Sequence, residues 1–314
     1  NFWTSRQKYE LKYKQTVIWT IICALLSPGI AIICIFLFDG NSLYARLFGS
    51  QVPLILIYAG FCVYLARQSK YKLNTSYWKV AFLFNLPLIP HYLSAYLLSS
   101  SDRLMIAHYI GDEATAIYSV AHSVGIVAMI IWSAVNASLI PYTYENCRKE
   151  NYSAISKVTI PILGVISVVC LLVILLAPEV VIIMATEEYA DAIYVIPPIV
   201  GSVFFQCLYY IFANVLYYYK KPKYVMVASL SATSINLILN AIFIPKFGYI
   251  AVGYTTLVSY SMQAVIDYLA MRHIIKQKIY DMRALTTLAV IVVVVALISN
   301  LVYGHDMVRY SILM

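Results

Sequence analysis

The chain has 314 residues, of which 62% are hydrophobic and only 11% are charged. Soluble domains are roughly 45–50% apolar and about 25% charged, so this composition, with a mean hydropathy of +0.80, excludes an ordinary soluble protein and indicates an all-α polytopic membrane protein. The formal net charge of +8 invites a nucleic-acid partner. The positions of the charges account for it instead, and nucleic-acid binding is not supported.

Apolar segments long enough to cross a bilayer follow one another along the chain. A spanning helix needs about 20 mostly apolar residues. By this rule the sequence predicts nine full spans, at 15–38, 50–66, 79–101, 114–140, 158–184, 192–219, 224–244, 249–271 and 284–303. A tenth span begins at Tyr310 and is cut off at Met314, and residue 1 is Asn. We therefore expect a fragment whose ends are not natural termini, with trimming or processing as the alternative.

The basic residues predict the topology. All but four of the 22 Lys and Arg residues fall in alternate connections between the spans, the exceptions being Arg46, Arg103, Lys246 and Arg309. Connections rich in Lys and Arg stay in the cytoplasm. The sequence thus predicts a multi-pass protein of the cytoplasmic membrane with its basic loops inside. Because every connection is short, we expect no large outer domain of the kind that membrane glycosyltransferases and polymerases use for catalysis.

Polar residues recur at helical spacing on five consecutive predicted spans, from 79–101 to 249–271. For any one span, hydrogen bonding between packed helices is a sufficient explanation. Five such stripes together favour a shared water-filled cavity, in which tyrosine and asparagine suit a sugar substrate. The residues predicted to line this path are His91, Tyr92, Tyr96, Asp102, Arg103, Tyr118, His122, Asn136, Gln206, Asn214, Asn236, Asn240 and Gln263.

Two acidic residues within the spans carry specific hypotheses. Ionised groups at membrane depth are costly unless they are paired or face water. Asp102 precedes Arg103, whose guanidinium is suited to pyrophosphate or carboxylate; the alternative is an anchor at the outer membrane surface, neutralised by Asp102. Asp267 is either a structural partner of a nearby base such as Arg272 or an ion-coupling residue. His91 and His122 are either hydrogen-bonded core residues or proton-coupling groups.

Metal and cofactor chemistry is not expected. The six cysteines are scattered without metal-ligand spacing, and no histidine pairs with a glutamate or cysteine at such spacing. The sequence therefore predicts no cofactor, no metal and no catalytic residue.

A weak internal repeat is present at an offset of 204 residues. It aligns Gly49 with Gly253, and Tyr64-Leu65-Ala66 with Tyr268-Leu269-Ala270. Repeated bundles that handle substrate between their two halves are common in transporters. The repeat favours a transporter of this kind.

Several motifs resemble one family. They are Pro87-Leu88-Ile89-Pro90-His91, Ser101-Asp102-Arg103, Gly111, Ile117-Tyr118-Ser119-Val120-Ala121 and Pro245-Lys246-Phe247-Gly248. In these residues the chain resembles bacterial polysaccharide flippases, which carry O-antigen or capsule repeat units. These belong to the multidrug/oligosaccharidyl-lipid/polysaccharide exporter superfamily, together with the lipid II flippase and the multidrug and toxin extrusion transporters.

The resemblance implies a two-lobed helical bundle. Residues 1–78 would be the end of the first lobe, 79–271 a complete second lobe of six helices, and 272–314 additional C-terminal helices, truncated. It also implies alternating-access flipping of undecaprenyl-pyrophosphate-linked oligosaccharide across the cytoplasmic membrane for polysaccharide biosynthesis, with Arg103 at the pyrophosphate. Besides this substrate, the expected partners are membrane lipids and a polysaccharide polymerase. The alternatives are a cation-coupled small-molecule exporter of the same fold and, less favoured, a membrane glycosyltransferase or polymerase.

Overall fold

The computed structural model describes residues 7, 13–37, 42–68, 75–185 and 187–303, and all regular secondary structure in these ranges is helical. The chain divides into two compact units, residues 1–79 and 80–314. The assignment of these two units to the two lobes of a transporter stays a prediction. The predicted span start at Tyr310 lies outside the described residues.

The first unit contains a hairpin of two long helices, α2 (Tyr13–Leu37) and α3 (Ser42–Gln68). The Ser27 hydroxyl donates to the Ser50 carbonyl at 3.0 Å and ties the two helices together. At Gly49 a Cβ atom would lie 2.7 Å from the Ala31 Cα atom. Only glycine allows this approach of the two backbones. The short helix α4 (Thr75–Asn85) crosses the boundary between the units.

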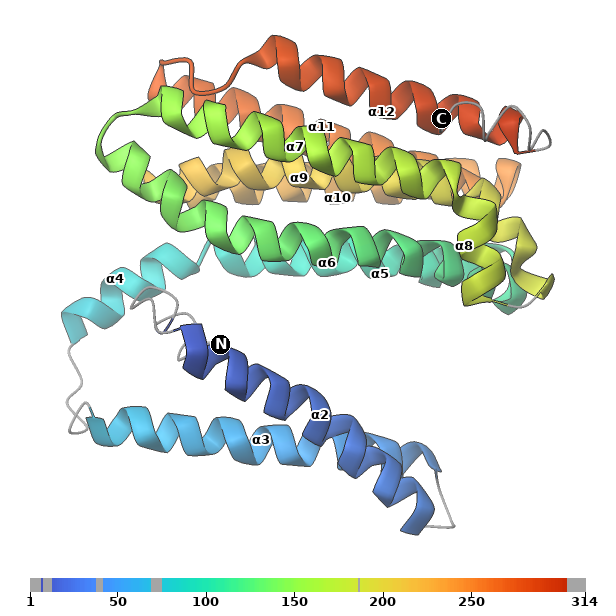
Figure 1. Ribbon diagram of the computed structural model, residues 1–314, viewed down its shortest axis with the longest axis horizontal. Helices are drawn as coiled ribbons and strands as arrows, with labels where there is room; N and C mark the ends of the chain where they lie inside the picture. Colours follow the sequence, from blue (N-terminus) through green and yellow to red (C-terminus); the bar gives the residue numbers. More distant parts are fainter. Residues whose placement is uncertain (1–6, 8–12, 38–41, 69–74, 186, 304–314) are drawn as a thin grey trace. The chain divides into compact units, whose positions relative to one another are not determined.

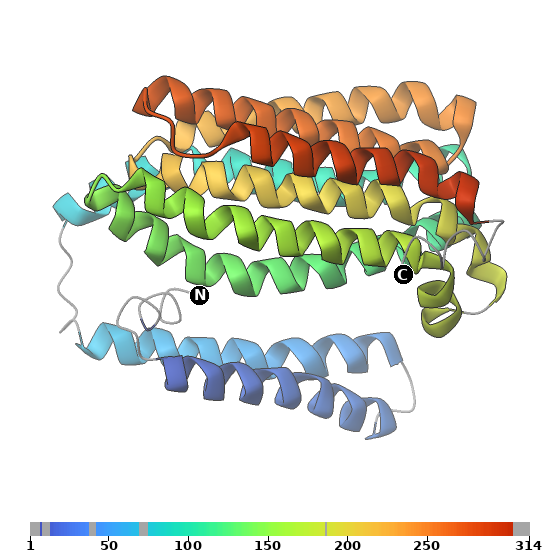
Figure 2. The ribbon, with the colours of Figure 1, turned by 45° about the horizontal axis from the view of Figure 1, so that its top comes forward.

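The second unit is a bundle of antiparallel helices (Figures 1 and 2). Its elements are α5 (Leu88–Tyr109), α6 (Asp112–Arg148), α7 (Tyr152–Leu175), α8 (Ala177–Met184), the 3₁₀ helix η1 (Glu187–Tyr194), α9 (Ile196–Tyr218), α10 (Pro222–Phe247), α11 (Ile250–Ile275) and α12 (Met282–Val302). Helix α9 packs against α6, α7, α11 and α12, while α10 joins α5 to α11. Helices α5, α6, α9, α11 and α10 therefore follow one another around a shared interior.

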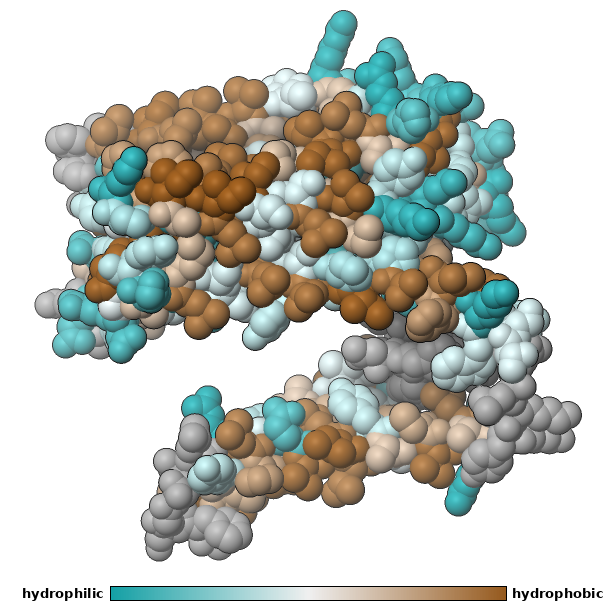
Figure 3. Space-filling model, turned by 180° about the vertical axis from the view of Figure 1, so that it is seen from behind, coloured by the Kyte–Doolittle hydropathy of each residue, from teal (hydrophilic) through white to brown (hydrophobic). Residues whose placement is uncertain are grey.

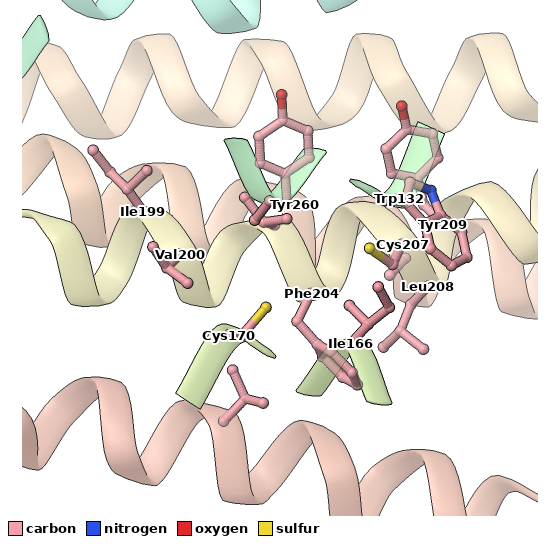
Figure 4. Close-up of a cluster of buried hydrophobic side chains, with 14 of the residues drawn as sticks. Trp132, Ile166, Cys170, Ile199, Val200, Phe204, Cys207, Leu208, Tyr209 and Tyr260 are labelled. Carbon is pink, nitrogen blue, oxygen red and sulfur yellow. The ribbon is translucent and has the colours of Figure 1, made fainter. Parts of the chain in front are cut away.

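The core of this bundle surrounds α9. In the most apolar window of α9, 89% of the residues are buried, as expected for a helix that is hydrophobic on all sides. Figure 4 shows Phe204 and Cys207 of α9 beside Ile166 and Cys170 of α7, with Tyr260 of α11 nearby. Burial of this kind contributes about 25 cal/mol per Å² of apolar surface in water, but between membrane helices close packing is the main contribution.

The predicted spans are confirmed as helices, with different boundaries. Eight segments of the described chain are long and apolar enough to cross a membrane. The remaining predicted span, 249–271, is α11, a helix of 26 residues that is long enough but not apolar enough to be counted among them. Its buried polar residues, Thr255, Thr256, Gln263 and Asp267 among them, lower its hydropathy.

Prolines account for the largest boundary errors. The predicted span 158–184 is broken, because α7 ends at Leu175 and Pro178 lies in the first turn of α8. The span 192–219 begins later, with Pro197 and Pro198 in the first turn of α9. The span 79–101 is interrupted before Leu88, where α5 begins after Pro87 and continues to Tyr109.

Polar and apolar surfaces are segregated along the bundle. On the face of the second unit drawn in Figure 3, hydrophobic residues cover the middle and hydrophilic residues gather toward the ends. The connections α6–α7, α9–α10 and α11–α12 lie at the same end of the antiparallel bundle and carry most of its basic residues. This matches the alternation of charge in the sequence. Which side faces the cytoplasm stays a prediction.

Candidate functional site

The carboxyl group of Asp102 lies at the centre of a buried polar cluster. The residue is on α5 and is 1% exposed. Its Oδ2 atom accepts hydrogen bonds from the Tyr118 hydroxyl at 2.7 Å and the Thr256 hydroxyl at 2.9 Å. Its Oδ1 atom accepts one from the Asn240 amide at 2.7 Å. Donors from α6, α11 and α10 thus converge on one carboxyl group.

A second layer of hydrogen bonds orients these donors. The Asn240 amide also donates to the Asn236 carbonyl oxygen at 3.1 Å, and the Asn236 amide donates to the Thr256 hydroxyl at 3.4 Å. The Thr255 hydroxyl donates to the side-chain oxygen of Asn240. We call the six residues of this network the Asp102 cluster: Asp102, Tyr118, Asn236, Asn240, Thr255 and Thr256.

Local sequence explains why these side chains meet. Asn236 and Asn240 are four residues apart and so share one face of α10. The Thr233 hydroxyl, on the same face, donates to the Ser94 carbonyl at 3.0 Å and ties α10 to α5. At Gly253 a Cβ atom would lie 2.7 Å from Pro198 Cγ, so glycine lets α11 approach α9 just before the two threonines.

The cluster stabilises a negative charge without supplying a positive one. No ion pair to Asp102 exists among the residues that the structure describes. An isolated buried carboxylate costs several kcal/mol even after relaxation. The side-chain oxygens of Asn236, Asn240 and Thr256 around it are of the amide and hydroxyl types that hard cations accept as ligands. Within the described ranges no group of three or more His, Cys, Asp or Glu residues is placed to hold a metal ion.

The expected pairing of Asp102 with Arg103 is wrong. Consecutive residues of a helix point about 100° apart and do not face each other. Arg103 turns away from the cluster, and its Nη2 atom lies 3.2 Å from His122 Nδ1 on α6. Its Nε atom is buried and has no hydrogen-bond partner in the described part of the chain. His122, in turn, has its ring 6.2 Å from that of Tyr118, so Arg103 and His122 lie next to the cluster.

A cavity of about 140 Å³ adjoins these groups. Asp102, Tyr118, His122, Gln206 and Thr256 are among the residues that line it. Four of these five belong to the predicted path. The structure therefore brings Asp102, Tyr118, His122 and Gln206 to one cavity, with Asn236 and Asn240 bonded behind it.

The remaining predicted path residues lie elsewhere in the bundle. Asn136 and Asn214 bond each other at 2.8 Å and join α6 to α9. Gln263 is buried on α11, and His91 is buried on α5 with its Nδ1 atom unpartnered. Tyr92 and Tyr96 are 65% and 66% exposed. A path through all of these residues stays a prediction.

Asp267 is buried and isolated. It is 0% exposed, and neither carboxyl oxygen has a hydrogen-bond partner among the described residues. The interpretation of Asp267 as a partner of Arg272 is wrong, because five residues along a helix leave two side chains about 140° apart. The Arg272 guanidinium instead donates to the Tyr268 hydroxyl at 3.3 Å.

Two members of the Asp102 cluster, Thr255 and Thr256, are not among the predicted path residues. Thr256 is part of the polar stripe on α11, but the sequence does not indicate which helix the stripe packs against. The available signal is the pair of hydroxyl residues that follows Gly253 at once. A glycine at a close helix contact indicates that the next turn lies deep in the bundle.

Two family models match the chain. The model of polysaccharide biosynthesis proteins matches residues 7–147, and the model MatE matches residues 87–242. Two solved structures share the fold. One is a crystal structure of a MATE protein in complex with MaL6, with a TM-score of 0.64. The other is the outward-facing conformation of a multidrug resistance MATE family transporter of the MOP superfamily, with a TM-score of 0.61.

Each of the two family models covers less than half of the chain, and the two solved structures show its fold. Each solved structure is 12% identical to it, and the match covers 83% of this chain and 63% of the other. Protein 1 of the Lsg locus of Haemophilus influenzae is 26% identical over 154 residues, which are 48% of this chain and 38% of that protein. The chain thus spans less than two thirds of the length of these relatives. The prediction of an all-α transporter fold is confirmed.

Proposed function

We propose that the protein flips an undecaprenyl-pyrophosphate-linked oligosaccharide from the inner to the outer leaflet of the cytoplasmic membrane. The observation that supports this substrate class is the match of residues 7–147 to polysaccharide biosynthesis proteins. The transporter fold supports movement of the substrate by alternating access, and not an enzymatic step on it. The basic loops would face the cytoplasm, by the positive-inside rule. A polysaccharide polymerase would use the flipped product.

Cation binding at the Asp102 cluster would drive the cycle. The cluster joins α5, α6, α10 and α11 through one carboxyl group. A proton or small cation at Asp102 removes the cost of the buried charge, and so favours the conformation in which these helices are closely packed. A ligand shifts a conformational equilibrium only by its difference in affinity between the two states. The cluster would be intact in one conformation and open in the other, and the cation would bind more tightly to the intact cluster. This would supply the difference in affinity.

Arg103 would contact the pyrophosphate. Among the residues that the structure describes, its guanidinium forms one hydrogen bond, to a neutral His122 that accepts at Nδ1. A guanidinium carries five N–H donors and binds phosphate oxygens in pairs. The buried, unpartnered Nε atom is available to an anion that enters from the side of α5 and α6.

Substitution of Arg103 in the full-length protein tests this function. In cells that lack the chromosomal copy, Arg103→Ala should lower surface polysaccharide about ten- to a hundredfold, because charge-assisted hydrogen bonds contribute about 1.5–3 kcal/mol. Arg103→Lys keeps the charge but loses the planar fork, and should be intermediate. Lys246→Ala, an exposed cation on α10, is the matched control. Full polysaccharide output from an Arg103→Ala protein at wild-type abundance would contradict the proposal.

The similarity to MATE structures supports a second candidate, a cation-coupled exporter of small molecules. The same cells distinguish the two functions. Loss of a flippase abolishes surface polysaccharide and leaves resistance to cationic drugs unchanged, whereas loss of a drug exporter does the reverse. If only drug resistance falls, the second candidate replaces the first.

A further inference from the structure

An open cavity of about 770 Å³ lies at the basic end of the second unit, away from the Asp102 cluster. It is formed where α7 begins, where α11 ends and by the connection from α11 to α12. In Figure 1 the start of α7 and this connection lie at the same end of the bundle. Its volume falls within the range of about 300–1,000 Å³ that is typical of ligand pockets.

The lining of this cavity is strongly cationic. Five basic residues from three helices and one connection contribute to it, and Asp281 is its one acidic residue. The basic residues are Lys157, Arg272, Lys276, Lys278 and Arg283. None of them forms an ion pair with another residue that the structure describes. The Asp281 carboxylate accepts the backbone N–H of Arg283 at 3.0 Å and so caps α12.

The wall of the cavity is held in place by the rest of the bundle. Tyr280 is 5% exposed; its hydroxyl donates to the Ile211 carbonyl of α9 at 3.3 Å, and its ring lies 5.6 Å from that of Phe212. The backbone N–H of Asp281 donates to the Ser156 hydroxyl of α7 at 3.3 Å. The cavity is therefore formed by the fold itself, and is more than a chance gathering of lysines on a mobile loop.

Charge and surroundings together define the ligand. Basic pockets between membrane helices at the cytoplasmic side bind phosphate headgroups of anionic lipids. Beyond the cavity, α7 and α12 pack together and expose apolar side chains, among them Val165, Val168, Val290 and Leu297. A ligand with a phosphate at one end and hydrocarbon chains at the other matches both surfaces. We propose that this cavity binds the phosphate headgroup of an anionic lipid.

The proposal does not depend on what the protein transports. The lipid phosphate could come from a bilayer phospholipid or from an isoprenyl pyrophosphate. Both have the chemistry that the cavity selects, an oxyanion attached to an apolar chain. Binding is therefore measured on the purified full-length protein, with no transport assay, so failure of the flippase proposal leaves this one standing.

The experiment compares two double variants that each remove two positive charges. Lys278→Gln with Arg283→Gln changes the cavity. Lys221→Gln with Lys223→Gln changes the α9–α10 connection and the first turn of α10, at the same end of the bundle. Equilibrium binding of fluorescent phosphatidylglycerol is measured for both in detergent. The cavity variant should bind about tenfold or more weakly than wild type, since each basic residue near the surface contributes about 1 kcal/mol. The control should stay close to wild type.

Competition then identifies the source of the phosphate. Farnesyl pyrophosphate that displaces the probe better than unlabelled phosphatidylglycerol points to an isoprenyl pyrophosphate, and the reverse order points to a bilayer phospholipid. Phosphatidylcholine should displace it poorly. If the two double variants weaken binding of the probe equally, the effect comes from the general surface charge and the proposal is overturned. Displacement by inorganic phosphate as effective as by either lipid would overturn it as well. Unchanged melting temperatures confirm that both variants are folded.

Discussion

Asp102 and Asp267 are two buried acidic residues in one helical bundle, and their hydrogen-bonding surroundings differ. Asp102 receives hydrogen bonds from three side chains on three other helices. Asp267 is equally buried, yet neither of its oxygens has a partner among the described residues. Burial alone therefore does not mark a functional carboxyl group. The convergent donors around Asp102 show a site built for an acceptor, and Asp267 has no comparable surroundings.

The largest effect is expected from Asp102→Ala. The substitution leaves the Tyr118 hydroxyl, the Asn240 amide and the Thr256 hydroxyl without their shared acceptor. Each of these three buried donors, left without its acceptor, costs about 1–3 kcal/mol. The free energy of unfolding should fall by about the sum of these costs, which a large drop in melting temperature in detergent would report. Asp102→Asn keeps one acceptor oxygen and should be less severe.

Asp267→Ala is the matched control for this variant. It truncates the same residue type at the same degree of burial but removes no hydrogen bond. It should therefore destabilise the protein much less than Asp102→Ala does. Equal losses of melting temperature for the two alanine variants would show that the donors around Asp102 contribute nothing beyond packing.

A smaller effect is expected from Tyr118→Phe. The variant removes one donor to Asp102 and keeps the buried ring. A hydrogen bond to a charged group contributes about 1.5–3 kcal/mol. In an Asp102→Asn background the same substitution should cost less, and the double-mutant cycle measures the difference as a coupling energy. Additive effects in the cycle would mean that Tyr118 and Asp102 act independently.

The sequence predicted the helices of this fold better than the contacts between them. Hydropathy located every long helix, because membrane length and apolar composition are properties of each segment alone. It also placed Asp102, Tyr118, Asn236 and Asn240 among the site residues. Packing between helices, at close contacts such as that of Gly253 with Pro198, decides which polar faces contact each other. This packing cannot be predicted from the sequence of any one segment.

The two wrong ion pairs have a different origin. Both joined residues near in sequence, Asp102 with Arg103 and Asp267 with Arg272. At 100° per residue these side chains leave their helices in different directions, so helical geometry alone excludes them. The basic cavity was missed for a third reason. Its lysines and arginines were interpreted as a topology signal. Their gathering around one cavity depends on the start of α7, which is distant in sequence from the connection between α11 and α12.

Asn136 and Asn214 provide an uncharged comparison with the two acids. Their side chains bond each other at 2.8 Å between α6 and α9. Asn214→Leu alone should cost about 1–3 kcal/mol, because the buried side-chain oxygen of Asn136 loses its donor. Replacing both with leucine should restore most of this stability, since no unsatisfied group remains. Melting temperatures of the single and double variants test this. A double variant no more stable than the single one would show a role for the pair beyond their mutual bond.

The smallest effect on stability is expected from Asp267→Leu. The two side chains are similar in size, and the substitution removes two buried oxygens that have no hydrogen-bond partner among the residues described. Replacing unsatisfied polar atoms with apolar ones of similar shape is nearly neutral or stabilising. The melting temperature should stay the same or rise slightly, whereas Asp102→Leu should lower it strongly. Surface polysaccharide then separates the two roles left to Asp267: retained output makes it dispensable, and lost output from a stable protein makes it an ion-coupling residue. A marked loss of stability would instead mean that Asp267 has a partner, and the contrast with Asp102 would fail.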